Sequence, residues 1–159
     1  MKINDVLSQI DLGNYALPEF QRGYVWTRSD VRKLMYSLYR DYPVGSLLIW
    51  DTATDPDITR GDGTPSSGTV SLILDGQQRM TSLFGVIRGK APQFFDGDAS
   101  AFTNLYFNID EETFEFYSQQ KMKGDRAWVS VSEVIPDSGG CFTKVIAERA
   151  DDMQDYAEA

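Results

Sequence analysis

The stretch that decides the fold runs from Leu72 to Gly89 and reads LILDGQQRMTSLFGVIRG. Its apolar beginning, followed by Asp-Gly, predicts a buried strand that ends in a sharp turn. After the turn, apolar residues recur at the spacing of one helix face, and Gly89 is typical of a helix C-terminal cap. The stretch therefore predicts a strand–turn–helix unit, with a helix over residues 77–88 whose apolar face is formed by Met80, Leu83, Phe84 and Ile87.

The start of this helix is a candidate anion site. The first N–H groups of a helix have no intrahelical partner, and the helix dipole adds partial positive charge there. Gly76 would let a ligand approach the backbone closely, and Arg79 could offer a bidentate fork to phosphate. Asp75 could orient Arg79 or hold Mg²⁺. An ordinary alternative is that Asp75 only caps the helix, and the residues alone leave both open.

A second segment, Phe20–Trp26, reads FQRGYVW and combines aromatic side chains with an arginine. A strand with an aromatic face in the core is the ordinary interpretation for Phe20 and Trp26. Arg22 would share that face, which is costly unless the charge is paired. We therefore expect either a break at Gly23 or a polar pocket around Arg22. Tyr24 could stack on a base or close an apolar pocket.

The rest of the chain predicts a mixed α/β single domain of 159 residues with interleaved helices and strands. A capping box at Thr27–Asp30 predicts the start of a helix, which Tyr42-Pro43 ends. A hairpin is expected around the turn at residues 110–112. The other expected elements are a short helix at 3–10, a strand at 45–50, a surface loop at 51–68, a short strand near 128–131 and a helical stripe at 142–156.

Composition excludes several chemistries. The chain has no histidine, which removes Ser-His-Asp and Cys-His catalysis and histidine-based metal nuclease centres. A single cysteine, Cys141, permits neither an intrachain disulfide nor a cysteine zinc site. The net charge of -9 argues against broad non-specific DNA binding. No apolar run reaches the length of a membrane span, and the N-terminus lacks a secretion signal, so we expect a cytoplasmic protein with no membrane partner.

Three ordered motifs carry a resemblance to a known family. They read LPEFQRGYVW at residues 17–26, YPVGSLLIW at 42–50 and LILDGQQRMTSLFGVIRG at 72–89. Together they resemble the N-terminal domain of GmrSD-type modification-dependent restriction proteins, which phosphorothioate-sensing SspE-type defence proteins share. The resemblance implies an α+β fold of the ParB/sulfiredoxin-like type. It also implies NTP binding, with GTP or ATP and Mg²⁺ as candidates, NTP hydrolysis, and a part in sensing modified DNA.

The resemblance also assigns residues to roles. Asp75, Gln78 and Arg79 would be catalytic, and Asp75 is the candidate Mg²⁺ ligand. Aromatic side chains would line the ligand pocket, namely Phe20, Tyr24 and Trp26. Nucleotide phosphates would be bound by Gln21, Arg22, Gly76, Gln77, Gln78, Arg79 and Thr81.

Proteins of this family usually continue with a helical region and a C-terminal HNH-type nuclease. Without histidine, the present chain is not a complete nuclease of that kind. We therefore expect it to be a piece of a longer protein or a stand-alone sensor. It would then act with a C-terminal nuclease domain or a partner subunit, with modified DNA, or as a homodimer. Two alternatives to a nucleotide-binding regulatory domain stay open: a non-enzymatic reader of modified DNA, and a degenerate scaffold.

Overall fold

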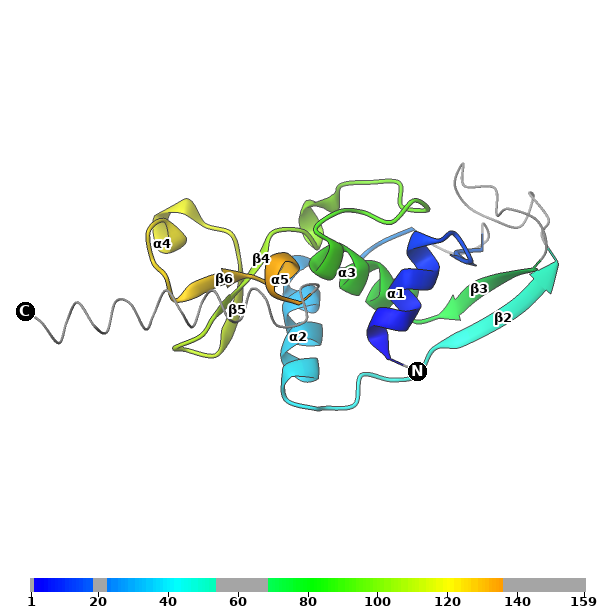
Figure 1. Cartoon of the computed structure of the whole chain (residues 1–159), viewed down its shortest axis with the longest axis horizontal. Helices are drawn as coiled ribbons and strands as arrows, with labels where there is room; N and C mark the ends of the chain where they lie inside the picture. The colour runs from blue at the N-terminus through cyan, green and yellow to red at the C-terminus, as the bar shows by residue number, and fades with distance from the viewer. Residues whose placement is uncertain (1, 19–22, 54–68, 136–159) are drawn as a thin grey trace, which may run out of the picture. The chain divides into compact units, whose positions relative to one another are not determined.

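A computed structural model describes residues 2–18, 23–53 and 69–135 of the chain. It divides the chain into two compact units, Met1–Thr103 and Asn104–Ala159, each of which contains its own three-stranded sheet (Figure 1). Five α-helices lie within the described ranges. The expected mixed α+β class is therefore confirmed. The assignment to a ParB/sulfiredoxin-like fold and to a single domain stays a prediction.

The first unit is built on a sheet with the strand order β1-β3-β2. The central strand β3 (Thr69–Asp75) pairs in parallel with the short β1 (Tyr15–Ala16) and antiparallel with β2 (Leu48–Ala53). The apolar run ahead of Asp75 is buried on this strand, as its composition predicts. The sheet thus delivers the chain to the turn at Gly76.

Strand β2 is displaced from its predicted position. It was expected at residues 45–50, but it begins at Leu48 and continues to Ala53. The prediction of a loop from residue 51 is therefore wrong for residues 51–53, and the remainder of that loop lies outside the described residues. Asp51 looks like a loop residue in the sequence, yet it pairs with Ser71 of β3. The Ser71 hydroxyl donates to the Asp51 carboxylate at 2.6 Å, which compensates the polar side chain at this strand position.

Three helices complete the first unit: α1 (Ile3–Asp11), α2 (Arg28–Tyr39) and α3 (Gln77–Arg88). The predicted capping box starts α2, because the Thr27 backbone N–H donates to the Asp30 carboxylate at 2.9 Å. The Thr27 hydroxyl accepts from the Asp30 backbone in return. Gly89 ends α3 in the left-handed conformation, with φ of 68°, as expected. All the predicted helix starts in this unit agree with the structure within one residue.

Helix α3 is the centre of the first unit. Every residue from Met80 to Ile87 is buried, so apolar contacts surround the helix and are not confined to the predicted face. Figure 1 shows α1 beside α3, consistent with contacts between them. At Gly85 the helix backbone lies directly against the ring of Phe102, which is itself fully buried. The position of α3 is therefore fixed by packing along most of its length.

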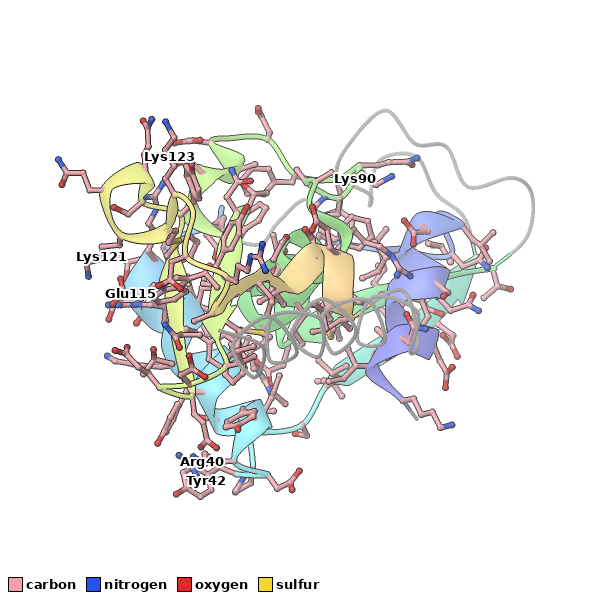
Figure 2. The ribbon with its side chains drawn as sticks, turned by 60° about the vertical axis from the view of Figure 1, so that its left-hand side comes forward. Arg40, Tyr42, Lys90, Glu115, Lys121 and Lys123 are labelled. Atoms are coloured by element: carbon pink, nitrogen blue, oxygen red, sulfur yellow. The ribbon has the colours of Figure 1, made fainter. Side chains whose placement is uncertain are left out.

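The second unit contains an antiparallel sheet with the order β5-β4-β6. Its strands are β4 (Leu105–Asn108), β5 (Thr113–Phe116) and β6 (Trp128–Ser130), accompanied by α4 (Gln119–Met122) and α5 (Val131–Val134). The predicted hairpin is confirmed, and the Asn108 side chain accepts from two turn N–H groups at 3.0 Å. Lys121 forms an ion pair with Glu115 at 3.6 Å (Figure 2). The helical stripe expected at 142–156 lies outside the described residues.

No helix within the described ranges combines the length and the apolar character that crossing a membrane requires.

We predict that Gly85→Ala destabilises the protein. A methyl group at this position would collide with the Phe102 ring. The cost of overpacking a core, about 1–3 kcal/mol, should exceed the gain of about 1 kcal/mol from replacing glycine inside a helix. Urea denaturation measures the change in the free energy of unfolding. Gly23→Ala is the control, because an added Cβ there meets nothing within 4 Å. Equal stability of the two variants would contradict the packing described for α3.

Candidate functional site

The turn between β3 and α3 requires glycine for two reasons. Gly76 is the N-cap of α3 and has a left-handed backbone with φ of 91°. A Cβ at this position would collide with Leu47 and would lie 3.1 Å from Nη2 of Arg79. No side chain caps the helix, so the alternative in which Asp75 is the N-cap is wrong. The start of α3 is formed by backbone N–H groups without a side-chain acceptor among the described residues.

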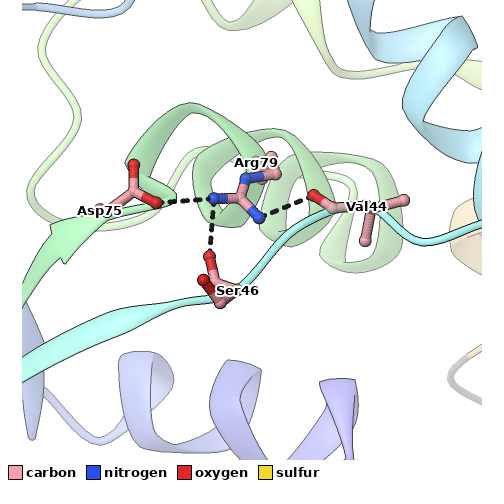
Figure 3. Close-up of polar contacts among 4 residues, drawn as sticks. All are labelled: Val44, Ser46, Asp75 and Arg79. Atoms are coloured by element: carbon pink, nitrogen blue, oxygen red, sulfur yellow. Dashed lines mark hydrogen bonds and ion pairs between the residues drawn. The ribbon is translucent and has the colours of Figure 1, made fainter.

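Arg79 braces this turn against the segment that precedes β2 (Figure 3). Its Nη1 donates to the Val44 carbonyl at 2.7 Å, and Nη2 donates to the Ser46 carbonyl at 2.7 Å. Nη2 also lies 3.1 Å from the Asp75 carboxylate, and the Arg79 side chain is only 16% exposed. A Cβ at Gly45 would stand 2.7 Å from Nη1, so the guanidinium also requires that glycine. Both terminal nitrogens are therefore directed at the protein itself, and the geometry supports a bracing role for Arg79.

Gln78 holds the upstream aromatic segment against α3. Its Oε1 accepts from the backbone N–H groups of Val25 and Trp26, at 2.8 and 3.3 Å. Its Nε2 donates to the Gly23 carbonyl at 3.2 Å. Residues 23–26 lie outside any strand, so the side-chain amide provides backbone hydrogen bonds that a neighbouring strand would otherwise provide. The expected alternatives, a break at Gly23 or a polar pocket around Arg22, stay predictions because residues 19–22 lie outside the described residues.

Tyr24 belongs to the core of the first unit. Its hydroxyl lies 2.8 Å from Oγ of Ser82, which donates to the Gln78 carbonyl at 2.7 Å. Its ring makes edge-to-face contacts with Phe95 and Phe102, at centroid distances of 5.7 and 5.1 Å. Burial raises the pKa of the Tyr24 hydroxyl above its ordinary value of 10.0. Tyr24 therefore has apolar neighbours on its ring, and both roles expected for it, stacking on a base and closing an apolar pocket, stay predictions.

The other predicted residues lie in different surroundings. Gln77 is the first residue of α3 and is half-buried. Thr81 is buried, with 2% of its surface exposed. Asp75 is 67% exposed and shares one carboxylate oxygen with Arg79. Within the described ranges, no three acidic or cysteine side chains gather as metal ligands. The remaining predicted residues, Phe20, Gln21 and Arg22, lie outside the described residues.

Beside Arg79 the surface forms an open depression of about 330 Å³. Trp26 lines it together with residues from α2 and from the segment before β2; the full lining is Trp26, Asp30, Lys33, Leu34, Ser37, Pro43, Val44 and Arg79. Neither Lys33 nor Ser37 is among the site residues predicted from the sequence. The sequence analysis also missed the Val44 and Ser46 carbonyls as partners of Arg79. The glycine of the YPVGSLLIW motif was the available signal for that contact.

Fold and site define a mixed α+β domain in which a strand, a glycine turn and a buried helix present an uncapped helix start. The family described as "GmrSD restriction endonuclease, N-terminal domain" matches residues 3–152. The chain belongs to this family, which supports the restriction-related role expected from its sequence. An uncharacterized protein of Methanocaldococcus jannaschii, MJ0686, is 35% identical over 101 residues. The match covers 52% of this chain and 16% of that relative, so the chain spans well under a fifth of the relative's length.

We predict that Arg79→Lys destabilises the first unit by about 1–3 kcal/mol, because a single ammonium cannot replace both ends of a planar fork that donates to two carbonyls. Thermal or urea unfolding measures the loss. Arg88→Lys is the matched control: Arg88 bonds Asp11 and Asn4 through side chains, which can follow a shorter cation. An Arg79→Lys variant as stable as Arg88→Lys would contradict the brace.

We predict that Tyr24→Phe lowers stability at neutral pH by about 0.5–1.5 kcal/mol, through loss of the bond to Ser82. The raised pKa of Tyr24 means that the folded state disfavours the phenolate. Its stabilising contribution is complete below the unfolded pKa near 10 and is lost as pH rises through the folded pKa. The stability difference between wild type and Tyr24→Phe should therefore shrink above pH 10. A difference that grows with pH in urea titrations would contradict this account.

Proposed function

We propose that the start of α3 binds the phosphates of a nucleotide, and that the domain is a nucleotide-binding regulatory domain of a DNA restriction system. The observation that carries the proposal is the uncapped helix start behind Gly76. The N–H groups of the first helical turn, at Gln77 and Gln78, lack intrahelical acceptors, and the helix dipole favours an anion there. Membership of the restriction family supports the wider role.

In the proposed site, Arg79 shapes the turn and is not a bidentate fork for phosphate. Arg79 fixes the turn through the Val44 and Ser46 carbonyls, so that the backbone N–H groups are preorganised. Its positive charge is partly offset by Asp75. A triphosphate carries several negative charges, so further cations are required. Gln21 and Arg22, carried over from the family motif, would supply polar and cationic contacts.

Hydrolysis of the bound nucleotide would rest on positioning and electrostatics, because the chain has no histidine to act as a base. Mg²⁺ is usually held by one or two carboxylates together with substrate phosphates. The exposed Asp75, at the end of β3, fits that donor set. Gln78 would act as a positioning residue, since its amide already bonds residues 23–26. Recognition of modified DNA and coupling to a nuclease region are proposals for the longer proteins of this family.

Gln77→Glu tests the proposal without weakening the helix. A carboxylate at the first helical position is favourable to the helix dipole but repels a bound phosphate. We predict that binding of GTP, ATP and inorganic tripolyphosphate falls about tenfold or more, while the free energy of unfolding is unchanged or slightly higher. Isothermal titration calorimetry and urea denaturation measure the two quantities.

Gln119→Glu is the matched control for this experiment. Gln119 is also the first residue of a helix, but this helix, α4, belongs to the second unit. The substitution changes the net charge by the same amount as Gln77→Glu. Binding should be close to wild type in this control. Equal affinities in Gln77→Glu and wild type, or no binding of any of the three ligands to wild type, would refute the proposed phosphate site.

A further inference from the structure

The depression beside Arg79 has the chemistry of a site for a flat heterocycle. Its apolar lining comes from Leu34, Pro43 and Val44, and Trp26 contributes a half-buried aromatic side chain. Small-molecule sites combine such apolar walls with a few convergent polar groups. An indole beside aliphatic groups can stack on a planar ring. The volume of about 330 Å³ lies at the lower end of the range for ligand pockets.

The polar lining comes from α2, where Asp30, Lys33 and Ser37 follow one another at helical spacing. Asp30 uses Oδ2 for the Thr27 cap, and its pKa is lowered chiefly by these hydrogen bonds, with a smaller contribution from Lys33. The carboxylate therefore stays charged at neutral pH. Hydroxyl, ammonium and carboxylate groups together can read the donors and acceptors on the edge of a base.

The same residues argue against a second phosphate in this depression. Asp30 contributes a negative charge to the lining, and Asp75 together with two carbonyls already satisfies the charged end of Arg79. The Lys33 ammonium is balanced by the Asp30 carboxylate, and the Arg79 guanidinium is already occupied, so the lining offers an anion little net attraction. A neutral, planar ligand with a polar edge does not depend on such attraction. Arg79 also connects the depression to the first turn of α3, where the phosphates are proposed to bind.

We propose that this depression binds the nucleobase of the nucleotide, with Trp26 against the ring and with Lys33 and Ser37 at its polar edge. The proposal rests on the proposed phosphate site at α3, and it assigns selectivity between bases to α2. Lys33 and Ser37 are then specificity-determining residues, and the phosphates contribute binding free energy that is common to all nucleotides.

The test compares the full chain and its variants against ATP, GTP, CTP, UTP and inorganic tripolyphosphate. Ser37→Ala is the decisive variant, because it changes no charge. Lys33→Met removes a cation, and Lys90→Met is its matched control, since Lys90 is exposed and lies beyond the C-terminus of α3 (Figure 2). Titration calorimetry gives each dissociation constant, and urea unfolding verifies that the variants remain folded.

We expect wild type to discriminate among the four nucleotides. Ser37→Ala and Lys33→Met should each reduce the spread of affinities about threefold to tenfold, the effect of one lost hydrogen bond. Tripolyphosphate binding should be unchanged in Ser37→Ala, and in Lys33→Met it should change no more than in Lys90→Met.

Two results would overturn the inference and leave the phosphate site in place. In the first, wild type binds tripolyphosphate, and the spread of nucleotide affinities is the same in both variants as in wild type. A wild type that does not discriminate among the four nucleotides counts as this result. The second is a loss of affinity in Lys33→Met that is equal for tripolyphosphate and for nucleotides, which would make the depression a phosphate site. If wild type binds neither tripolyphosphate nor any nucleotide, both the base site and the phosphate site are refuted.

Discussion

The first unit depends on one guanidinium group that satisfies three acceptors from two segments. Arg79 reaches from the first turn of α3 to the carbonyls of Val44 and Ser46 and to Asp75. These contacts demand glycine at positions 45 and 76, because any larger residue would intrude on the guanidinium or on Leu47. The glycine of YPVGSLLIW and the Asp-Gly of the third motif are thus explained by the same side chain. A partly buried arginine with carbonyl and carboxylate partners is stable where an unpaired one would be costly.

Gln78 extends this arrangement to the first motif, LPEFQRGYVW. Its amide bonds residues 23–26, and those residues lead directly into the Thr27 cap of α2. Tyr24 adds a half-buried ring and a hydroxyl bond to Ser82, one helical turn after Gln78. Adjacent residues of the DGQQR sequence therefore attach different segments to the start of α3. The side chains that look most like ligand-binding groups support the structure, which leaves the backbone N–H groups as the proposed anion contacts.

The periodicity of apolar residues and the positions of turn residues predicted the local elements well. The start of α3 at Gln77, its end at Gly89, the capping box of α2 and the hairpin in the second unit follow from side-chain spacing and turn residues alone. The bounds of β2 could not be predicted, because aspartate is rare in strands and the partner of Asp51, the Ser71 hydroxyl, lies 20 residues away in the sequence. The contacts of Arg79 with the Val44 and Ser46 carbonyls could not be predicted for a similar reason. Carbonyl acceptors 33 and 35 residues away leave no trace in local sequence, and only the fold brings them together.

The central claim is that backbone N–H groups at the start of α3 bind phosphate while Arg79 holds the turn in shape. Titration of the ¹⁵N-labelled chain with inorganic tripolyphosphate, followed by amide chemical shifts, tests this most directly. We expect the largest saturable shifts at the amides of Gln77 and Gln78, with little change at the amides of Val44 and Ser46. Shifts spread evenly over exposed lysines and arginines, with Gln77 and Gln78 unmoved, would contradict it.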